Sequence, residues 1–149
     1  MKFQQELLHQ VYDDIQGLLK VHWEEIALNK DFIKLNPDWE QYEKAEQEGI
    51  LKGFTAREDG KLVGYFVTIV QRSLHYSDYI FATNDVIFLH PEYRKGLAGW
   101  RLVKFAEKCL KEDGVSILFI NTKVHKPFDA LVTRMGYNLV ERVYSKRLN

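Results

Sequence analysis

The segment from Asn84 to Val103 constrains the fold most, because an apolar strand, a basic turn with glycines and an amphipathic helix follow one another in it without interruption. A turn that opens a helix leaves several backbone N–H groups unpaired and pointing one way, and the helix dipole adds partial positive charge there. Arg94 and Lys95 add full charges, and Gly96 and Gly99 let the backbone approach an anion closely. The segment therefore predicts a site for a diphosphate.

Hydrophobic periodicity and turn residues place further helices and strands on both sides of this segment. The expected elements are helices over 2–20 and 36–49, strands over 50–57, 61–72 and 79–89, a helix over 98–113, a strand over 116–122, a helix over 128–135 and a strand over 139–148. The helix after the glycine turn is expected to dock through Leu102, Val103, Ala106 and Leu110. The order ααβββαβαβ predicts an α/β (α+β) fold in one domain over residues 1–149, with a central mixed, mostly antiparallel sheet flanked by helices.

The charge balance and the cysteine content narrow the function classes. Twenty-one basic and 21 acidic residues give a formal net charge of zero, which disfavours a nucleic-acid or membrane partner. No apolar run reaches the length of a membrane span, so the expected location is cytoplasmic. A single cysteine, Cys109, excludes an internal disulfide, and His75 and His90 lack a third ligand at suitable spacing, so no metal is expected.

Around the glycine turn, the chain resembles the acetyl-CoA-binding core of the GNAT-type N-acetyltransferases, in particular members often encoded by bacteriophages. The family pattern reads roughly V-x-P-x-Y-R-x-x-G-x-G/A before a helix with paired apolar residues. The residues that match it without a gap are Leu89, Pro91, Tyr93, Arg94, Gly99, Leu102 and Val103. Leu97 stands where the first motif glycine belongs; a shift of one residue puts Gly96 and Ala98 on the glycine positions but loses the match at Arg94.

The resemblance implies that acetyl-CoA binds as cosubstrate, with its diphosphate on the amides of residues 96–100. The cofactor-binding set that it implies is Phe88, Leu89, Arg94, Lys95, Gly96, Leu97, Ala98, Gly99, Trp100 and His125. Phe88 and Leu89 would act through their backbone, which in the relatives holds the thioester oxygen and the pantetheine. His125 stands where relatives often place a cofactor-contacting Asn, and a loop histidine that caps a helix is the alternative.

Acyl transfer from a thioester to an amine needs a group that removes the ammonium proton. Asp85 stands where relatives carry this base, and the alternative is a strand-edge Asp that bonds local backbone. Relatives often return a proton to the thiolate from a Tyr, which Val132 replaces here. Tyr144, on the last expected strand, is a further catalytic candidate, and a Tyr packed on the sheet is its alternative.

The acceptor is expected near the first two helices, where relatives place an acceptor-binding loop, although exposed helix faces also show such a pattern. The residues at that place are His22, Trp23, Glu24 and Glu25, with Trp39 and Tyr42 as further members.

Together these features predict an acyl-CoA-dependent N-acyltransferase, an enzyme that transfers acetyl to a primary amine by direct attack in a ternary complex, because the sequence offers no plausible nucleophile for a covalent intermediate. Whether the acceptor is a small molecule or a protein is not readable, and a homodimer is left open. The alternative is a GNAT-fold binding or structural protein with little or no catalysis, such as a phage virion or anti-defence component in the virion or the host cytoplasm.

Overall fold

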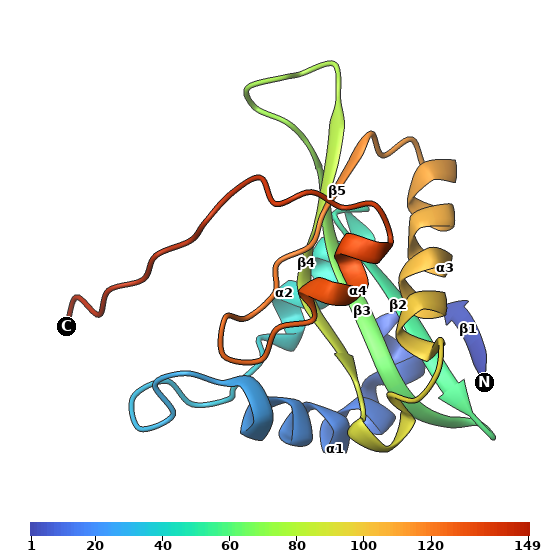
Figure 1. The fold of residues 1–149 in the computed structure, drawn as a ribbon, viewed down its shortest axis with the longest axis vertical. Helices are drawn as coiled ribbons and strands as arrows, with labels where there is room; N and C mark the ends of the chain where they lie inside the picture. Colours follow the sequence, from blue (N-terminus) through green and yellow to red (C-terminus); the bar gives the residue numbers. More distant parts are fainter.

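A computed structural model describes all 149 residues, and its centre is a five-stranded mixed sheet with the strand order β1-β2-β3-β4-β5 (Figure 1). The strands are β1 (Lys2–Gln5), β2 (Leu51–Glu58), β3 (Lys61–Arg72), β4 (Ile80–Leu89) and β5 (Ile117–Phe119). The first four pair antiparallel, and β5 pairs parallel with β4. The predicted fold class is thus confirmed, with differences at both ends of the chain.

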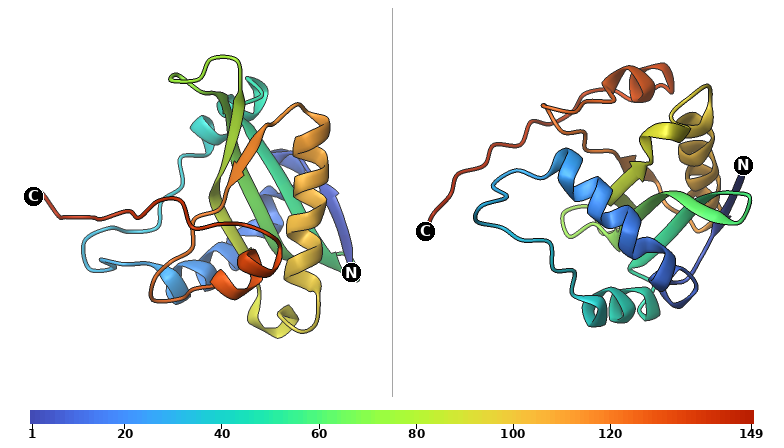
Figure 2. Two further views of the ribbon diagram at one scale, coloured as in Figure 1. Left: turned by 45° about the horizontal axis from the view of Figure 1, so that its top comes forward. Right: turned by 90° about the horizontal axis from the view of Figure 1, so that it is seen from below.

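Helices cover both faces of this sheet, as the view from below shows (Figure 2). Their bounds are α1 (Leu8–Ile26), α2 (Trp39–Gln47), α3 (Ala98–Glu112) and α4 (Asp129–Arg134), with a short 3-10 helix η1 (Pro91–Tyr93) before α3. A core between α3 and the sheet includes Phe54 and Phe66, and a smaller core between α1 and the sheet includes Tyr65 and Phe88. None of the helices is long and apolar enough to cross a membrane.

Helix α3 docks through the four apolar residues that the sequence predicts. Leu102, Val103, Ala106 and Leu110 are all buried, and Lys108 on the opposite face is exposed. Apolar side chains at helical spacing form one continuous stripe, which the sheet covers. The turn that precedes α3 is therefore held in place by a well-packed helix.

At the N-terminus, the predicted helix over residues 2–20 is wrong in its first turn. Residues Lys2–Gln5 form β1, which pairs with the edge of β2, and Phe3 packs against the larger core. The helical spacing of Phe3 and Leu7 is equally compatible with a short strand before a helix, and pairing with β2 decides between them. The helix begins at Leu8 and continues to Ile26, six residues beyond the predicted end at residue 20.

At the C-terminus, the predicted strand over residues 139–148 does not form. These residues adopt no regular structure, are exposed throughout and leave the body of the molecule beyond α4 (Figure 1). A strand needs a partner for its backbone groups, and no strand of this chain pairs with the segment. The strand predicted over residues 116–122 is also shorter than expected, since β5 covers only Ile117–Phe119.

Strand β4 has two irregularities close together, a β-bulge on the β3 side and an early end to its pairing with β5. Val67 of β3 pairs with Val86 and Thr68 pairs with Asn84, so Asp85 is an extra residue, a β-bulge, in β4. On the other edge of β4, the pairing with β5 ends at Thr83, opposite Phe119. From Asn84 onwards, β4 and β5 therefore separate.

Candidate functional site

The glycine turn presents free backbone amides at the start of α3. Gly96 has a φ of 65°, a conformation that glycine adopts without strain, and Leu97 is the N-cap of the helix. The first amide bonded into the helix is that of Arg101, which donates to the Leu97 carbonyl at 2.8 Å. The amides of Ala98, Gly99 and Trp100 are thus left without a helical acceptor, as at any helix start.

The side chain of Leu97 lies at the surface, at the edge of the turn. It is 60% exposed and forms no part of the packed core. Beside it, Lys95 is exposed and forms no ion pair, so its charge is free to face an anion. Together with Ala98 and Arg101, Lys95 and Leu97 line a shallow hollow at the start of α3.

Arg94, in contrast, is fully engaged within the protein. Its two terminal nitrogens donate to the two carboxylate oxygens of Glu25 on α1, both at 2.7 Å, and its Nε donates to the Leu89 carbonyl at 2.7 Å. The hydrogen bonds from Arg94 lower the pKa of Glu25. The guanidinium also lies over the Phe88 ring, 5.1 Å from its centroid. Arg94 thereby fastens the end of β4 to α1.

Where β4 and β5 separate, the side chain of Asn84 bridges β4 to the backbone of Asn121, which follows β5. Asn84 Oδ1 accepts from the Asn121 backbone N–H at 2.6 Å, and Asn84 Nδ2 donates to the Asn121 carbonyl at 3.2 Å. These side-chain bonds replace a ladder step, so the two strands remain connected while their backbones move apart. The only sequence signal for this role is a polar residue at the start of an apolar strand.

Beyond the asparagine bridge, the free edge of β4 exposes backbone groups toward the gap. The His90 N–H donates to the Val63 carbonyl of β3 at 2.8 Å. Because bonding alternates along an antiparallel strand, the backbone of Phe88 faces β3, whereas the N–H groups of Ile87 and Leu89 face the gap. Of the two residues predicted to bind through their backbone, Leu89 lies on the open side and Phe88 does not.

The bulge turns Asp85 toward α2. The Asp85 carboxylate is exposed, and Tyr42 on α2 donates its hydroxyl to Asp85 Oδ2 at 2.5 Å. Burial and this hydrogen bond raise the pKa of Tyr42, so the phenol keeps its proton and acts as a donor. A bulge that re-aims one side chain is a frequent device beside active sites. Asp85 and Tyr42, both candidates from the sequence, are thus brought together.

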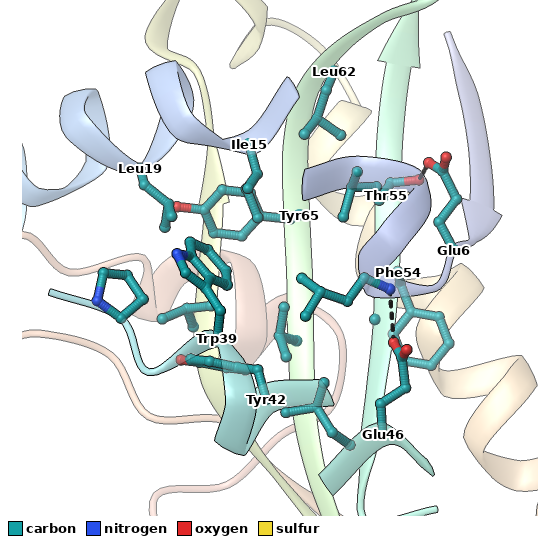
Figure 3. A pocket seen from close by; sticks show the side chains of 17 residues that line it. Glu6, Ile15, Leu19, Trp39, Tyr42, Glu46, Phe54, Thr55, Leu62 and Tyr65 are labelled. Atoms are coloured by element: carbon teal, nitrogen blue, oxygen red, sulfur yellow. Dashed lines mark hydrogen bonds between the residues drawn. The ribbon is translucent and has the colours of Figure 1, made fainter. Parts of the chain in front are cut away.

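Tyr42 also lines an apolar cavity between the sheet and helices α1 and α2 (Figure 3). Trp39 and Tyr42 reach it from α2, Ile15 and Leu19 from α1, and Tyr65 from β3. Twelve of its 17 lining residues are hydrophobic, so it suits an apolar group.

Two glutamates line the cavity, and both already accept hydrogen bonds from within the protein. Glu6 pairs with Arg57, and Glu46 Oε2 accepts from the Leu8 backbone N–H at 2.9 Å. Of the two carboxylates that line the cavity, Glu6 is therefore neutralised by a cation, whereas Glu46 bonds only a backbone amide.

His22 lies on α1 and is buried, not on an exposed loop where acceptor binding was expected. Its Nδ1 is 2.6 Å from the hydroxyl of Tyr65, and its ring stacks on Phe88 with centroids 4.5 Å apart. Burial lowers the pKa of His22 to about 4; the cations Arg94 and Lys123 act in the same direction, and Glu25 opposes them. Burial also raises the pKa of Tyr65. The pair is a neutral, hydrogen-bonded part of the core beneath β4.

Two predicted site residues lie apart from this cluster. Tyr144 is 87% exposed in the C-terminal segment, and the strand that was to carry it does not form. His125 Nε2 donates to the Ile26 carbonyl at the end of α1, at 2.9 Å, so it caps a helix, although not the helix that follows it. Cys109 packs against the larger core, where burial raises the pKa of its thiol.

Comparison with known proteins identifies the family. Residues 10–137 match the Acetyltransferase (GNAT) family. The chain belongs to the GNAT family. No curated protein matches it.

Solved GNAT-fold structures superpose over the whole chain. Ribosomal-protein-alanine N-acetyltransferase from Brucella melitensis biovar Abortus 2308 has a TM-score of 0.74 at 19% identity, with 99% of this chain and 100% of that chain covered. Aminoglycoside N-acetyltransferase AAC(6')-Iy in complex with CoA has a TM-score of 0.72 at 16% identity, with 99% of each chain covered. Aminoglycoside acetyltransferase HMB0005 from an uncultured soil metagenomic sample has a TM-score of 0.77 at 14% identity, with 99% of this chain and 98% of that chain covered. At these identities the likeness establishes the shared fold.

Proposed function

We propose that this GNAT-family protein is an acetyl-CoA-dependent N-acetyltransferase that acetylates a primary amine by direct attack. The observation that supports this most is the position of the Asp85 bulge, which aims a carboxylate at the α2 side of the sheet where β4 separates from β5. In this arrangement, Asp85 would act as a proton acceptor beside the open edge of β4, next to the Tyr42 that lines the apolar cavity. Such an arrangement serves a reaction in which two ligands meet across one strand.

The residues around the glycine turn fit the acyl donor. The amides of Ala98, Gly99 and Trp100 would hold its diphosphate, with Lys95 as the free cation, while the Leu89 amide faces the gap that would take the pantetheine. When bound, acetyl-CoA supplies an activated thioester. Arg94 contributes by fixing the end of β4 against α1, and Gly96 and Leu97 complete the turn.

Asp85 would remove the proton that the attacking ammonium must lose, directly or through a water molecule. Tyr42 donates to one carboxylate oxygen and thereby orients it, which leaves the other oxygen for the acceptor. Cys109 is unsuited to a covalent intermediate because it is partly buried against the larger core and the pKa of its thiol is raised. Direct transfer is therefore the route that the residues support.

The acceptor amine would carry an apolar substituent. The cavity beside Tyr42 is lined mostly by hydrophobic side chains, and its carboxylates Glu6 and Glu46 are already bonded within the protein. A polycationic acceptor would require several carboxylates without a cation partner there, and Glu46 alone meets this condition. A buried cation without a partner is strongly disfavoured. Helix α2 has no fully buried residue, so it can shift to admit a ligand.

The test is release of free CoA thiol from acetyl-CoA in the presence of paired acceptors. We expect turnover with 2-phenylethylamine and 3-methylbutylamine, and much weaker turnover with ethanolamine and spermidine, which have the same reacting group without a purely apolar body. Calorimetry with acetyl-CoA alone separates cofactor binding from turnover. Binding without turnover on any amine would favour a GNAT-fold binding protein instead, the role that Val132 in place of the usual tyrosine acid supports.

A further inference from the structure

The gap between β4 and β5 is closed at one end by a bridge of two asparagines, Asn84 and Asn121. Four hydrogen bonds form this bridge, and two of them join the Asn84 side chain to the Asn121 backbone. In return, Asn121 Nδ2 donates to Thr83 Oγ1 at 3.1 Å and to Asn84 Oδ1 at 3.4 Å. A carboxamide has both an acceptor and donors, so Asn84 presents to Asn121 what a peptide group of a neighbouring strand would present. The bridge is therefore a wall with a fixed shape.

The strands behind this wall are paired and packed. The ladder between β4 and β5 ends at Thr83, opposite Phe119. The Phe119 ring lies edge-on to the Phe81 ring, with centroids 5.6 Å apart. A group that fills the gap therefore cannot extend past the bridge unless it breaks hydrogen bonds and separates paired strands.

The other end of the gap opens at the glycine turn. The Leu89 N–H faces the gap, and the free amides at the start of α3 follow β4 in the chain. Asp85, at the closed end, is the direct neighbour of Asn84. A base that takes the proton of the attacking amine must lie close to the reacting carbon. An acyl donor that enters from the turn thus brings its acyl group to Asp85 with the bridge directly ahead.

We infer that the Asn84–Asn121 bridge restricts the acyl group to acetyl and excludes longer chains. Additional methylene groups would displace the Asn84 side chain, and its partners on Asn121 would lose their hydrogen bonds to an apolar group that replaces none of them. The apolar cavity offers no alternative, since it lies on the α1 and α2 side and serves the acceptor. The inference rests on the proposed function, because it takes Asp85 as the proton acceptor.

The test compares the binding of two thioesters, acetyl-CoA and butyryl-CoA, by calorimetry without any acceptor amine. For the wild type, we expect the dissociation constant of butyryl-CoA to be roughly tenfold or more above that of acetyl-CoA. Asn84→Ala removes the wall and should bring the two constants within about threefold of each other, mainly through tighter binding of butyryl-CoA.

Two further variants guard this comparison. Asn84→Ser keeps a polar but shorter side chain, so it should retain the fold if Asn84→Ala does not, and it should also weaken the preference for acetyl-CoA. Thr122→Ala is the matched control, because it removes a side-chain hydrogen bond to Asp129 in the same segment and leaves the bridge intact. It should keep the preference of the wild type. Circular dichroism of each variant checks the fold.

The outcomes separate this inference from the proposed function. Equal binding of both thioesters by the wild type, or an unchanged preference in the folded Asn84 variants, would overturn the role of the bridge and leave acetyl transfer untouched. The expected preferences without turnover on any amine would support the bridge and contradict the enzyme. Absence of binding by either thioester would contradict both.

Discussion

Asp85 owes its direction to one extra residue in β4. Without the bulge, alternation would put Asp85 and Val86 on opposite faces of the sheet, whereas here Val86 lines the cavity and Asp85 bonds Tyr42 on the same side. The carboxylate thus stays in water and still points at the place where an amine can enter. Its neighbour Asn84 bridges β4 to Asn121 where the strands separate, so two adjacent residues serve the two halves of the site.

At this scale, we expect Asp85→Asn to slow acetylation by a factor of about 10² to 10⁴, the usual contribution of general-base assistance. Asparagine has the same shape and still accepts the Tyr42 hydrogen bond, so the fold and the affinity for acetyl-CoA should be retained. Single-turnover acetylation and calorimetry on the same preparations measure the two effects. An unchanged rate would make Asp85 a structural residue of the strand.

Arg94→Ala tests whether Arg94 stabilises the fold through its ion pair with Glu25 or binds the cofactor. Loss of a bidentate pair that is partly exposed, 42% at Arg94 and 19% at Glu25, should lower the free energy of unfolding by roughly 1 to 2 kcal/mol. Lys104→Ala, which removes the exposed Lys104–Glu107 pair on α3, is the control and should cost about 0.5 kcal/mol or less. Urea denaturation measures both. A neutral Arg94→Ala with lost acetyl-CoA binding would assign Arg94 to the cofactor instead.

Among the elements, α3 holds the glycine turn in place, and the sequence correctly predicts which face of α3 is buried. We expect Leu102→Ala to lower the free energy of unfolding by roughly 2 to 5 kcal/mol, since Leu102 is fully buried beneath the sheet. Lys108→Ala on the exposed face should change it by less than about 0.5 kcal/mol. Thermal or urea melts of both variants check the difference, and equal shifts would contradict the docking of α3 through this face.

The predictable elements are those whose evidence is local. Periodicity fixes the buried face of α3, and the Glu58-Asp59-Gly60 turn indicates the hairpin of β2 and β3. Phe3 fits a helix and a strand equally, so β1 depended on the distant edge of β2. The Tyr42–Asp85 bond joins residues 43 positions apart, and the Arg94–Glu25 pair joins residues 69 apart. Such contacts arise from packing, which a single sequence does not display.

For the molecule as a whole, the buried His22 makes stability depend on pH. Its pKa is about 4 in the folded protein, against an ordinary value of 6.5, so the unfolded chain binds a proton first as the pH falls. Stability is therefore complete above about pH 6.5 and is lost between there and about pH 4.

Between pH 7 and pH 5, we expect His22 to reduce the free energy of unfolding by about 2 kcal/mol. His22→Gln, whose amide oxygen still accepts from Tyr65, should lose most of this dependence. Urea denaturation at the two pH values measures the difference between the proteins. Parallel pH dependence in both would show that another group is responsible.

The open edge of β4 also allows ligand binding to be followed by hydrogen exchange of the protein itself. The Ile87 and Leu89 N–H groups face a gap, not a neighbouring strand, so their hydrogens should exchange with deuterated solvent faster than those of Val86 and Phe88, which bond β3. A ligand that fills the gap would slow the first pair and leave the second unchanged. Deuterium uptake at alternate residues of one strand can therefore register occupancy before any acceptor amine has been identified.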